Sequence, residues 1–214
     1  MSGKALLITD VTNCFCPNGE LPVTDGNLVV APINRMSKHA DNHAGEWVLK
    51  ILTRDWHDKD SGHFKKWPAH GVKFTRGSEF HPKLRIRSNV IPVAIVSKGL
   101  GKINDGYSPF DPASEVNIIL IYPNGNAYPW EGDLESLLRN FSVDTIMNSG
   151  LATDYCVKSG SIDSTKRGFN TYLLIDACRA FDLKQGDETL ALNEMVNAGV
   201  KFATTDEVIC GKAG

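Results

Sequence analysis

The sequence has no long apolar run and no excess of charge of one sign. Nowhere do ~18 apolar residues follow one another, so no segment has the length of a transmembrane helix. Its 23 Lys and Arg residues nearly balance 25 Asp and Glu residues, which leaves a net charge of −2. Proteins that bind nucleic acid or anionic membranes usually carry a basic surface, which this composition does not supply. We therefore expect neither a nucleic acid nor a membrane as a partner.

Cysteine is scarce, and the number of cysteines is odd. The apolar run at residues 5–9 is too short for the core of a signal peptide, and it stops at an acid. An odd number of cysteines without a secretion signal favours reduced thiols. We therefore expect a cytoplasmic protein whose thiols are either structural or reactive. The five candidates are Cys14, Cys16, Cys156, Cys178 and Cys210.

Short apolar runs that do not alternate with polar residues are typical of strands buried on both faces of a sheet. Five such runs occur, at residues 5–9, 47–52, 93–96, 143–147 and 171–175, and residues 118–122 are a candidate for one more. Helical spacing of apolar residues lies between them, at 27–43, 154–167 and 187–197. Strands that alternate with helices predict an α/β fold with a mostly parallel sheet.

One domain, residues 1–214, fits the length and the absence of internal repeats. Residues 55–91 break the alternation of strands and helices, because they are rich in His, Gly, Pro and Trp and have few periodic apolar positions. Residues 111–132 are similarly irregular. Long loops inside a compact domain are usually functional, so we expect the first of these segments to carry part of the site.

Four side chains that can take part in chemistry follow the ends of predicted strands. Asp10, Asp55 and Lys98 follow the first three strands, and Cys156 lies just after the fourth. In folds of this class, ligands bind outside the carboxyl ends of the strands. Each residue alone is better explained as a cap, a turn or a surface position. Their convergence on one rim, the edge of the sheet formed by the carboxyl ends of the strands, favours a catalytic site.

A metal site is suggested by the sequence Asp55-Trp56-His57. In an extended segment, residues two apart point the same way, so the carboxylate and the imidazole can reach one ion. His63 and His70 follow in the same loop. One carboxylate with two histidines suits zinc, iron or manganese. Ordinary polar loop residues explain the pattern about equally well, because short motif matches are often accidental.

Cys156 lies in the sequence Ser-Gly-Leu-Ala-Thr-Asp-Tyr-Cys-Val (149–157), where a strand turns into a helix. A thiol at the start of a helix feels the positive end of the dipole, which lowers its pKa and favours the thiolate. Free backbone N–H groups there can bind an oxyanion. A buried inert cysteine is the more common case. That interpretation fits the other four cysteines, among which only Cys178 competes as a nucleophile.

The nucleophile needs a base, and no histidine lies in an obvious partnering position. Asp10 can serve if burial raises its pKa, and Lys98 can hold it ionised and favour the thiolate. Phe15, Trp56 and Trp67 lie on the same loops. Aromatic walls suit a flat heteroaromatic substrate, although each ring alone is more often part of the core.

Taken in order, these motifs resemble the nicotinamidase/pyrazinamidase branch of the isochorismatase-like hydrolases. The resemblance covers nearly the whole chain and rests on residues 5–19, 53–57 with 67–70, 96–99 and 150–157. It implies a three-layer αβα sandwich around a mostly parallel sheet of roughly six strands. It also implies hydrolysis of nicotinamide to nicotinic acid and ammonia through a cysteine thioester, in NAD salvage, with pyrazinamide as a second substrate. A homo-oligomer is compatible with it.

The resemblance also assigns roles to residues. Asp10, Lys98 and Cys156 are the catalytic group, in which Asp10 takes the thiol proton. The backbone N–H groups of Ala152 and Cys156 bind the oxyanion, with a cis peptide between Leu151 and Ala152. One divalent ion, zinc or else iron or manganese, binds the pyridine nitrogen, and two aromatic side chains flank the ring. The implied ligands are Asp55, His57 and His70, with His63 as a further candidate, and the flanking residues are Phe15 and Trp67.

Three other functions are alternatives to this one. An amidohydrolase for a carbamoyl amide or a ureido acid would share the thiol, but that branch generally lacks the metal motif. An isochorismatase has no role for a nucleophilic cysteine. A non-catalytic module would use the metal and the thiol structurally. One departure from the family pattern is Cys14, which stands where many relatives have an acidic residue.

Overall fold

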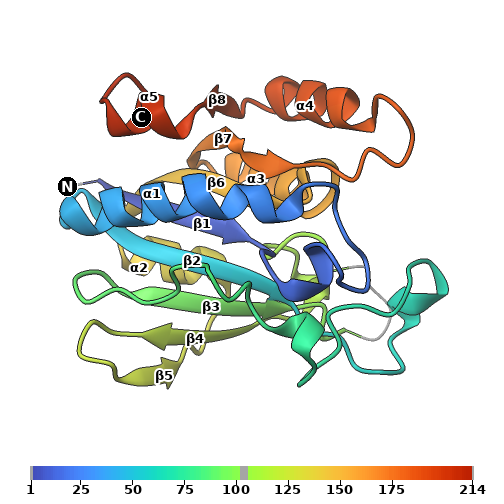
Figure 1. The fold of residues 1–214 in the computed structure, drawn as a ribbon. Helices are drawn as coiled ribbons and strands as arrows, with labels where there is room; N and C mark the ends of the chain where they lie inside the picture. Colours follow the sequence, from blue (N-terminus) through green and yellow to red (C-terminus); the bar gives the residue numbers. More distant parts are fainter. Residues whose placement is uncertain (1, 102–105, 214) are drawn as a thin grey trace.

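The strands of the protein join one sheet, seen in the computed structural model, which describes residues 2–101 and 106–213. The order across the sheet is β5-β4-β3-β2-β1-β6-β7-β8 (Figure 1). Neighbouring pairs are parallel from β3 to β8, whereas β4 and β5 are added antiparallel at one edge. The strands are β1 (Gly3–Thr9), β2 (Trp47–Asp55), β3 (Val93–Lys98), β4 (Asn117–Ile121), β5 (Ala127–Pro129), β6 (Val143–Leu151), β7 (Asn170–Arg179) and β8 (Lys201–Ala203).

The predicted mostly parallel sheet is confirmed, but it has eight strands among the described residues and not roughly six. The five predicted strands and the candidate at 118–122 correspond to β1, β2, β3, β6, β7 and β4. The two missed strands, β5 and β8, have three residues each and lie at the edges of the sheet. Edge strands of this length bury little surface, so they leave no apolar run in the sequence.

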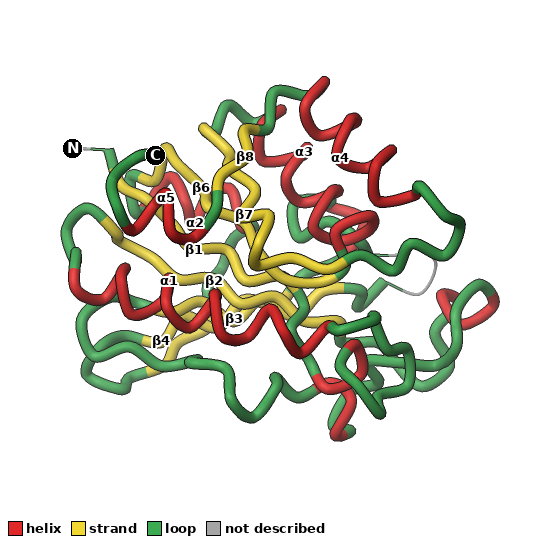
Figure 2. Tube along the Cα trace, turned by 45° about the horizontal axis from the view of Figure 1, so that its top comes forward, coloured by secondary structure: helices red, strands yellow, loops and turns green. Residues whose placement is uncertain are grey.

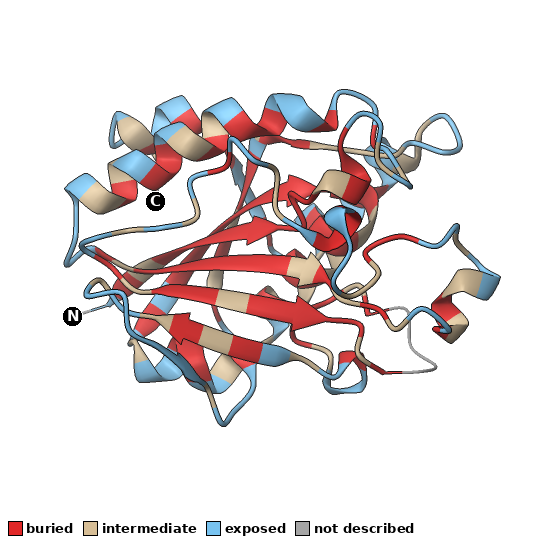
Figure 3. Ribbon diagram, turned by 60° about the horizontal axis from the view of Figure 1, so that its bottom comes forward, coloured by how far each residue is buried: buried red, intermediate tan, exposed pale blue. Residues whose placement is uncertain are grey.

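Helices cover both faces of the sheet, which confirms the three-layer αβα arrangement (Figure 2). Side chains of β1 alternate between the faces: Leu6 packs with Ile33 of α1, and Leu7 packs with Leu137 of α2. The strands at the centre of the sheet are therefore buried on both sides (Figure 3). One face carries α1 (Val30–Asn42) and α5 (Thr205–Ile209), and the other carries α2 (Leu134–Asn140), α3 (Lys158–Lys166) and α4 (Asp187–Asn197).

The three predicted helices are present, and two short ones were not predicted. α2 has 7 residues and α5 has 5, too few to show helical periodicity. The start of α5 did have a readable signal, because Thr204 and Glu207 form a capping box. Among the described residues, no helix combines the length and the apolar character needed to cross a bilayer.

The direction in which the chain adds strands changes beside β1. From β1 it proceeds to β2 and β3 on one side, and it later places β6 on the other side of β1. The carboxyl ends of β1 and β6 therefore border a topological switch point, where ligands bind in open α/β sheets. Asp10 follows β1, and Cys156 follows β6. Asp55 and Lys98 are the last residues of β2 and β3.

Candidate active site

The structure brings the four predicted residues at the carboxyl edge of the sheet together: three of them surround the ammonium group of the fourth, Lys98. Lys98 Nζ lies 2.9 Å from Asp10 Oδ2 and 3.5 Å from Cys156 Sγ, and it also donates to Asp55 Oδ1. Thr53 Oγ1 donates to Asp10 Oδ1 at 2.6 Å. Thr53 was not singled out from the sequence, although it lies two residues before Asp55 on β2 and therefore points to the same face.

Burial and charge give the two carboxylates opposite properties. Burial raises the pKa of Asp10, and Lys98 opposes this only in part. Burial also acts on Asp55, but the Lys98 ammonium and the neighbouring His57 and His70 rings outweigh it and hold its pKa well below the usual range. Burial would lower the pKa of Lys98, but the two carboxylates raise it well above its ordinary value. Asp55 therefore stays ionised, and Asp10 is the carboxylate suited to carry a proton.

The Cys156 thiol differs from the sequence expectation in one respect. Burial raises its pKa well above the ordinary value, and the nearby Lys98 ammonium lowers it by less. The lowering of the pKa that the start of a helix favours is therefore outweighed here, because loss of hydration is the larger effect. A thiol with a raised pKa needs a base to remove its proton. Asp10 is placed for this role, because its carboxylate and the Cys156 sulfur both contact the Lys98 ammonium.

The strand-to-helix turn that carries Cys156 is unusually tight. The Leu151–Ala152 peptide is cis, as the resemblance implied. A π-helical turn, Thr153–Val157, then leads into α3. Gly150 has a φ of 117°, and a Cβ atom there would lie 2.0 Å from the Thr9 carbonyl oxygen. Glycine is therefore required for β6 to approach β1 closely at this point.

Three histidines form a cluster beside the catalytic group. The side chains of His57, His63 and His70 are buried, and one nitrogen of each lies within 4.8 Å of the others. The ring of His63 stacks on that of His57, with centroids 4.6 Å apart. Asp55 Oδ2 lies 3.6 Å from His57 Nε2 and 3.4 Å from His70 Nε2. The structure thus gathers the three predicted ligands and also the further candidate, His63.

Backbone carbonyls orient two of these rings. Gly99 O lies 3.0 Å from His57 Nδ1, and Pro68 O lies 2.7 Å from His70 Nδ1. An imidazole that donates from Nδ1 presents the lone pair of Nε2, which is how metal-binding histidines are usually held. The buried Nε2 of His57 has no hydrogen-bond partner among the described residues. Such an atom is costly unless a ligand satisfies it, so the donor set fits a divalent metal ion.

A narrow cavity connects the histidine cluster with the thiol. Its lining includes residues of the metal site and of the nucleophile turn, namely Asp55, His63, His70, Ala152 and Cys156. Most of its wall is apolar or aromatic. The wall consists of Phe15 and Trp67, which were predicted from the sequence, and of Leu21, Tyr107, Tyr155 and Phe181, which were not predicted as wall residues.

Trp56 does not belong to this wall, although its place in the loop suggested that it would. Asp55 and His57 point into the site, and Trp56 lies between them on an extended segment, so its ring points the other way. There the Arg54 guanidinium lies 3.7 Å from its ring centroid, and Phe74 meets it edge-on. Trp56 therefore packs on the outside of the loop.

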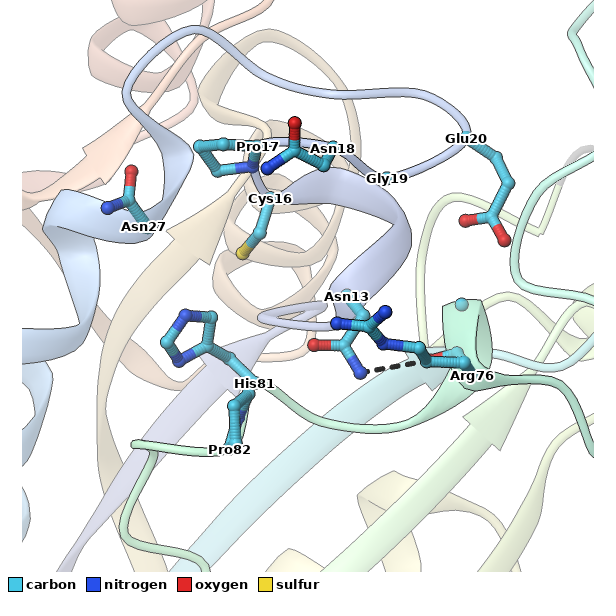
Figure 4. A pocket seen from close by; sticks show the side chains of 11 residues that line it. Asn13, Cys16, Pro17, Asn18, Gly19, Glu20, Asn27, Arg76, His81 and Pro82 are labelled. Atoms are coloured by element: carbon cyan, nitrogen blue, oxygen red, sulfur yellow. Dashed lines mark hydrogen bonds between the residues drawn. The ribbon is translucent and has the colours of Figure 1, made fainter.

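A larger hollow lies beside the loop that carries Phe15. Its volume is about 400 Å³, and it is lined by polar side chains that include Asn13, Arg76 and His81 (Figure 4). The Cys16 thiol also lines it, and burial raises the pKa of that thiol to about 11. None of the rim residues reaches this hollow. Its size alone therefore does not make it the reaction site.

The model of the isochorismatase domain matches residues 4–207. The chain belongs to the isochorismatase family. The order of rim residues along the sequence and their convergence in space both agree with this membership.

Within the isochorismatase family, the chain is similar to amidases. It is 30% identical over 223 residues to a nicotinamidase of Escherichia coli, covering 95% of this chain and 96% of that protein. It is 31% identical over 208 residues to a nicotinamidase/pyrazinamidase of Mycobacterium tuberculosis, covering 93% and 97%. A crystal structure of pyrazinamidase of Pyrococcus horikoshii in complex with zinc has a TM-score of 0.74 and 31% identity, covering 94% of this chain and 98% of that one.

Proposed function

We propose that the protein is a nicotinamidase, an amide hydrolase that converts nicotinamide to nicotinic acid and ammonia. One observation carries this proposal: a cavity with aromatic walls opens both on the Cys156 thiol and on the histidine cluster. A flat heteroaromatic carboxamide matches both ends, since its ring nitrogen can meet a metal while its amide carbon meets the thiol. The related nicotinamidases, at about 30% identity over most of the chain, support the same substrate.

The catalytic steps use Asp10 and Cys156. Asp10 takes the thiol proton, and the sulfur attacks the amide carbon of the substrate. The C–N bond then breaks as Asp10 returns the proton to the departing nitrogen, which leaves as ammonia. Asp10 next takes a proton from a water molecule that attacks the thioester carbon. The acid is released, and the proton returns to the sulfur.

Lys98 and the backbone amides assist these steps. The Lys98 ammonium stabilises the thiolate and the ionised state of Asp10, from 3.5 Å and 2.9 Å. The N–H groups of Ala152 and Cys156 lie in the turn at the nucleophile and would bind the oxyanion that forms on the amide oxygen.

A metal site and an aromatic pair would hold the ring. Asp55, His57 and His70, joined by His63, would bind one divalent ion, with zinc ahead of iron and manganese. Such an ion supplies a Lewis-acid position for a ring nitrogen. Phe15 and Trp67 would flank the ring, which also suits pyrazinamide. We further propose that residues 1–214 act as one domain, an arrangement that the single sheet supports, and that the enzyme is cytoplasmic.

Release of ammonia tests this proposal. The metal-loaded protein is mixed with nicotinamide, with pyrazinamide, and with a carbamoyl amino acid as an amide of a different class. We expect ammonia from the first two and little from the third. Ammonia from the carbamoyl compound alone would assign the protein to a different group of amidohydrolases.

A further inference from the structure

A buried carboxylate joins the nucleophile turn to the loop that follows β7. Asp154 lies two residues before Cys156, and only 5% of its surface is exposed. Its Oδ1 accepts from the Phe181 amide at 3.0 Å, and its Oδ2 accepts from the Asp182 amide at 2.9 Å. Both oxygens are thus used by two consecutive N–H groups of a distant segment. Asp154 fixes the backbone at Phe181 relative to the nucleophile.

The ring of Phe181 meets three other rings of the cavity wall. It lies nearly parallel to Trp67, with centroids 5.9 Å apart and an interplanar angle of 29°. It meets Tyr155 edge-on at 5.7 Å and Phe15 edge-on at 6.2 Å. Phe181 therefore bridges the two residues that we propose to flank the substrate ring.

The cavity between these walls is small. Its volume is about 20 Å³, which is room for about one water molecule. A pyridine ring can enter only if a wall side chain rotates away. Trp67 is held by a hydrogen bond from its Nε1 to the Tyr107 hydroxyl at 2.9 Å, and Phe15 is 4% exposed. Phe181 is partly exposed, whereas Phe15 is buried, and it follows the end of β7, so its ring is the less confined of the two.

We propose that Phe181 is the adjustable wall that sets which aromatic rings the cavity accepts, and that Asp154 is a positioning residue acting through it. This proposal rests on the proposed function. When the Phe181 side chain rotates, its backbone stays fixed by Asp154, so the ring closes again on a bound pyridine. A flat ring of six atoms is then enclosed between Phe181, Phe15 and Trp67. A larger bicyclic ring is rejected because Phe181 cannot close on it.

The test compares a small and a large substrate in Phe181→Ala. Kinetics are measured with nicotinamide and with quinoline-3-carboxamide on the metal-loaded protein. We expect KM for nicotinamide to rise about tenfold, the upper range for one lost aromatic contact, while kcat changes less than about twofold. The ratio of kcat/KM for the bicyclic amide to that for nicotinamide should rise at least about tenfold. An unchanged KM and an unchanged ratio would overturn the proposal.

Phe74→Ala is the matched control, and Phe181→Leu is the second variant. Phe74 also meets a tryptophan edge-on, but it is 90% exposed and lies outside the cavity. We expect no change in the ratio for Phe74→Ala, and an intermediate ratio for Phe181→Leu, which keeps an apolar side chain. If Phe181→Ala does not fold, as judged by its thermal unfolding midpoint, Phe181→Leu decides the question.

A double-mutant cycle tests the role of Asp154. Asp154→Asn removes one of two acceptors, so KM and the substrate ratio should shift in the same direction as in Phe181→Ala, but by less. In the Phe181→Ala background, Asp154→Asn should then add less than about a twofold change. A large fall in kcat that persists in that background would show that Asp154 acts on Cys156 directly, which contradicts the positioning role.

Failure of the proposed function can be told apart from failure of this proposal. If the wild-type protein releases no ammonia from nicotinamide, the proposed function is wrong. The wall is then judged by calorimetric binding of pyridine-3-carboxylic acid and quinoline-3-carboxylic acid to the same variants. A shift of selectivity toward the bicyclic acid in Phe181→Ala supports the wall, and unchanged selectivity or no binding of either acid overturns it.

Discussion

The Lys98 ammonium lies 3.5 Å from the Cys156 sulfur, and both side chains are buried at the carboxyl end of the sheet. Two carboxylates, Asp10 and Asp55, share the same ammonium. This arrangement separates the roles of the acids. Asp55 is held ionised and faces the histidines, whereas Asp10 keeps a raised pKa and is suited to carry the proton of the thiol.

Cys156→Ala should abolish the release of ammonia from nicotinamide, by at least about a thousandfold, because it removes the sulfur that forms the thioester. The fold and the metal content should stay unchanged, as measured by circular dichroism and elemental analysis. Cys178→Ala is the matched control. That thiol is also buried, but it packs in the core with Leu173 and Met195 and does not line the cavity, so its removal should leave most of the activity. The reverse pattern would make Cys178 the nucleophile.

Asp10→Asn should lower kcat at least about a hundredfold at every pH, since the amide cannot carry the proton. The pH profile of kcat/KM is the measurement. A variant that keeps its activity and only shifts its optimum would argue against Asp10 as the proton carrier. Asp144→Asn changes an exposed carboxylate of β6 and should behave as the wild type.

His57→Ala should weaken metal binding at least about tenfold, because it removes a ring whose Nε2 has no hydrogen-bond partner within residues 2–101 and 106–213. Affinity for nicotinic acid should fall with it. Elemental analysis after dialysis and calorimetry measure the two quantities. Trp56→Ala, at the neighbouring outward-facing position, should keep its metal. Unchanged metal content in His57→Ala would refute the ligand assignment.

The sequence predicted the rim of the site better than its wall. Asp10, Asp55 and Lys98 were placed correctly because the carboxyl ends of parallel strands meet at one edge, whatever the loops do. Phe181 and Leu21 come from loops, whose course depends on distant contacts such as those made by Asp154. No periodicity in the sequence records such contacts. Trp56, by contrast, was wrongly grouped with the wall, although alternation along the extended segment 55–57 already points its ring away from Asp55 and His57.

Asp41→Ala should destabilise the fold without involving the site. Lys50 is fully buried, and its Nζ lies 2.6 Å from Asp41 Oδ1. Removal of the carboxylate leaves a buried charge unpaired, which typically costs about 3–5 kcal/mol in the free energy of unfolding. Urea unfolding measures the change. Asp206→Ala breaks only the exposed pair with Arg35 and should cost less than about 1 kcal/mol. Equal effects in the two variants would contradict this explanation.

The most direct test of the central claim is the mass of the intact protein, quenched with acid during turnover of nicotinamide. The mechanism predicts a fraction of the chain heavier by one nicotinoyl group, attached to the peptide that carries Cys156 and absent from Cys156→Ala. Steady release of ammonia with no adduct on Cys156, together with an active Cys156→Ala variant, would contradict covalent catalysis by this thiol.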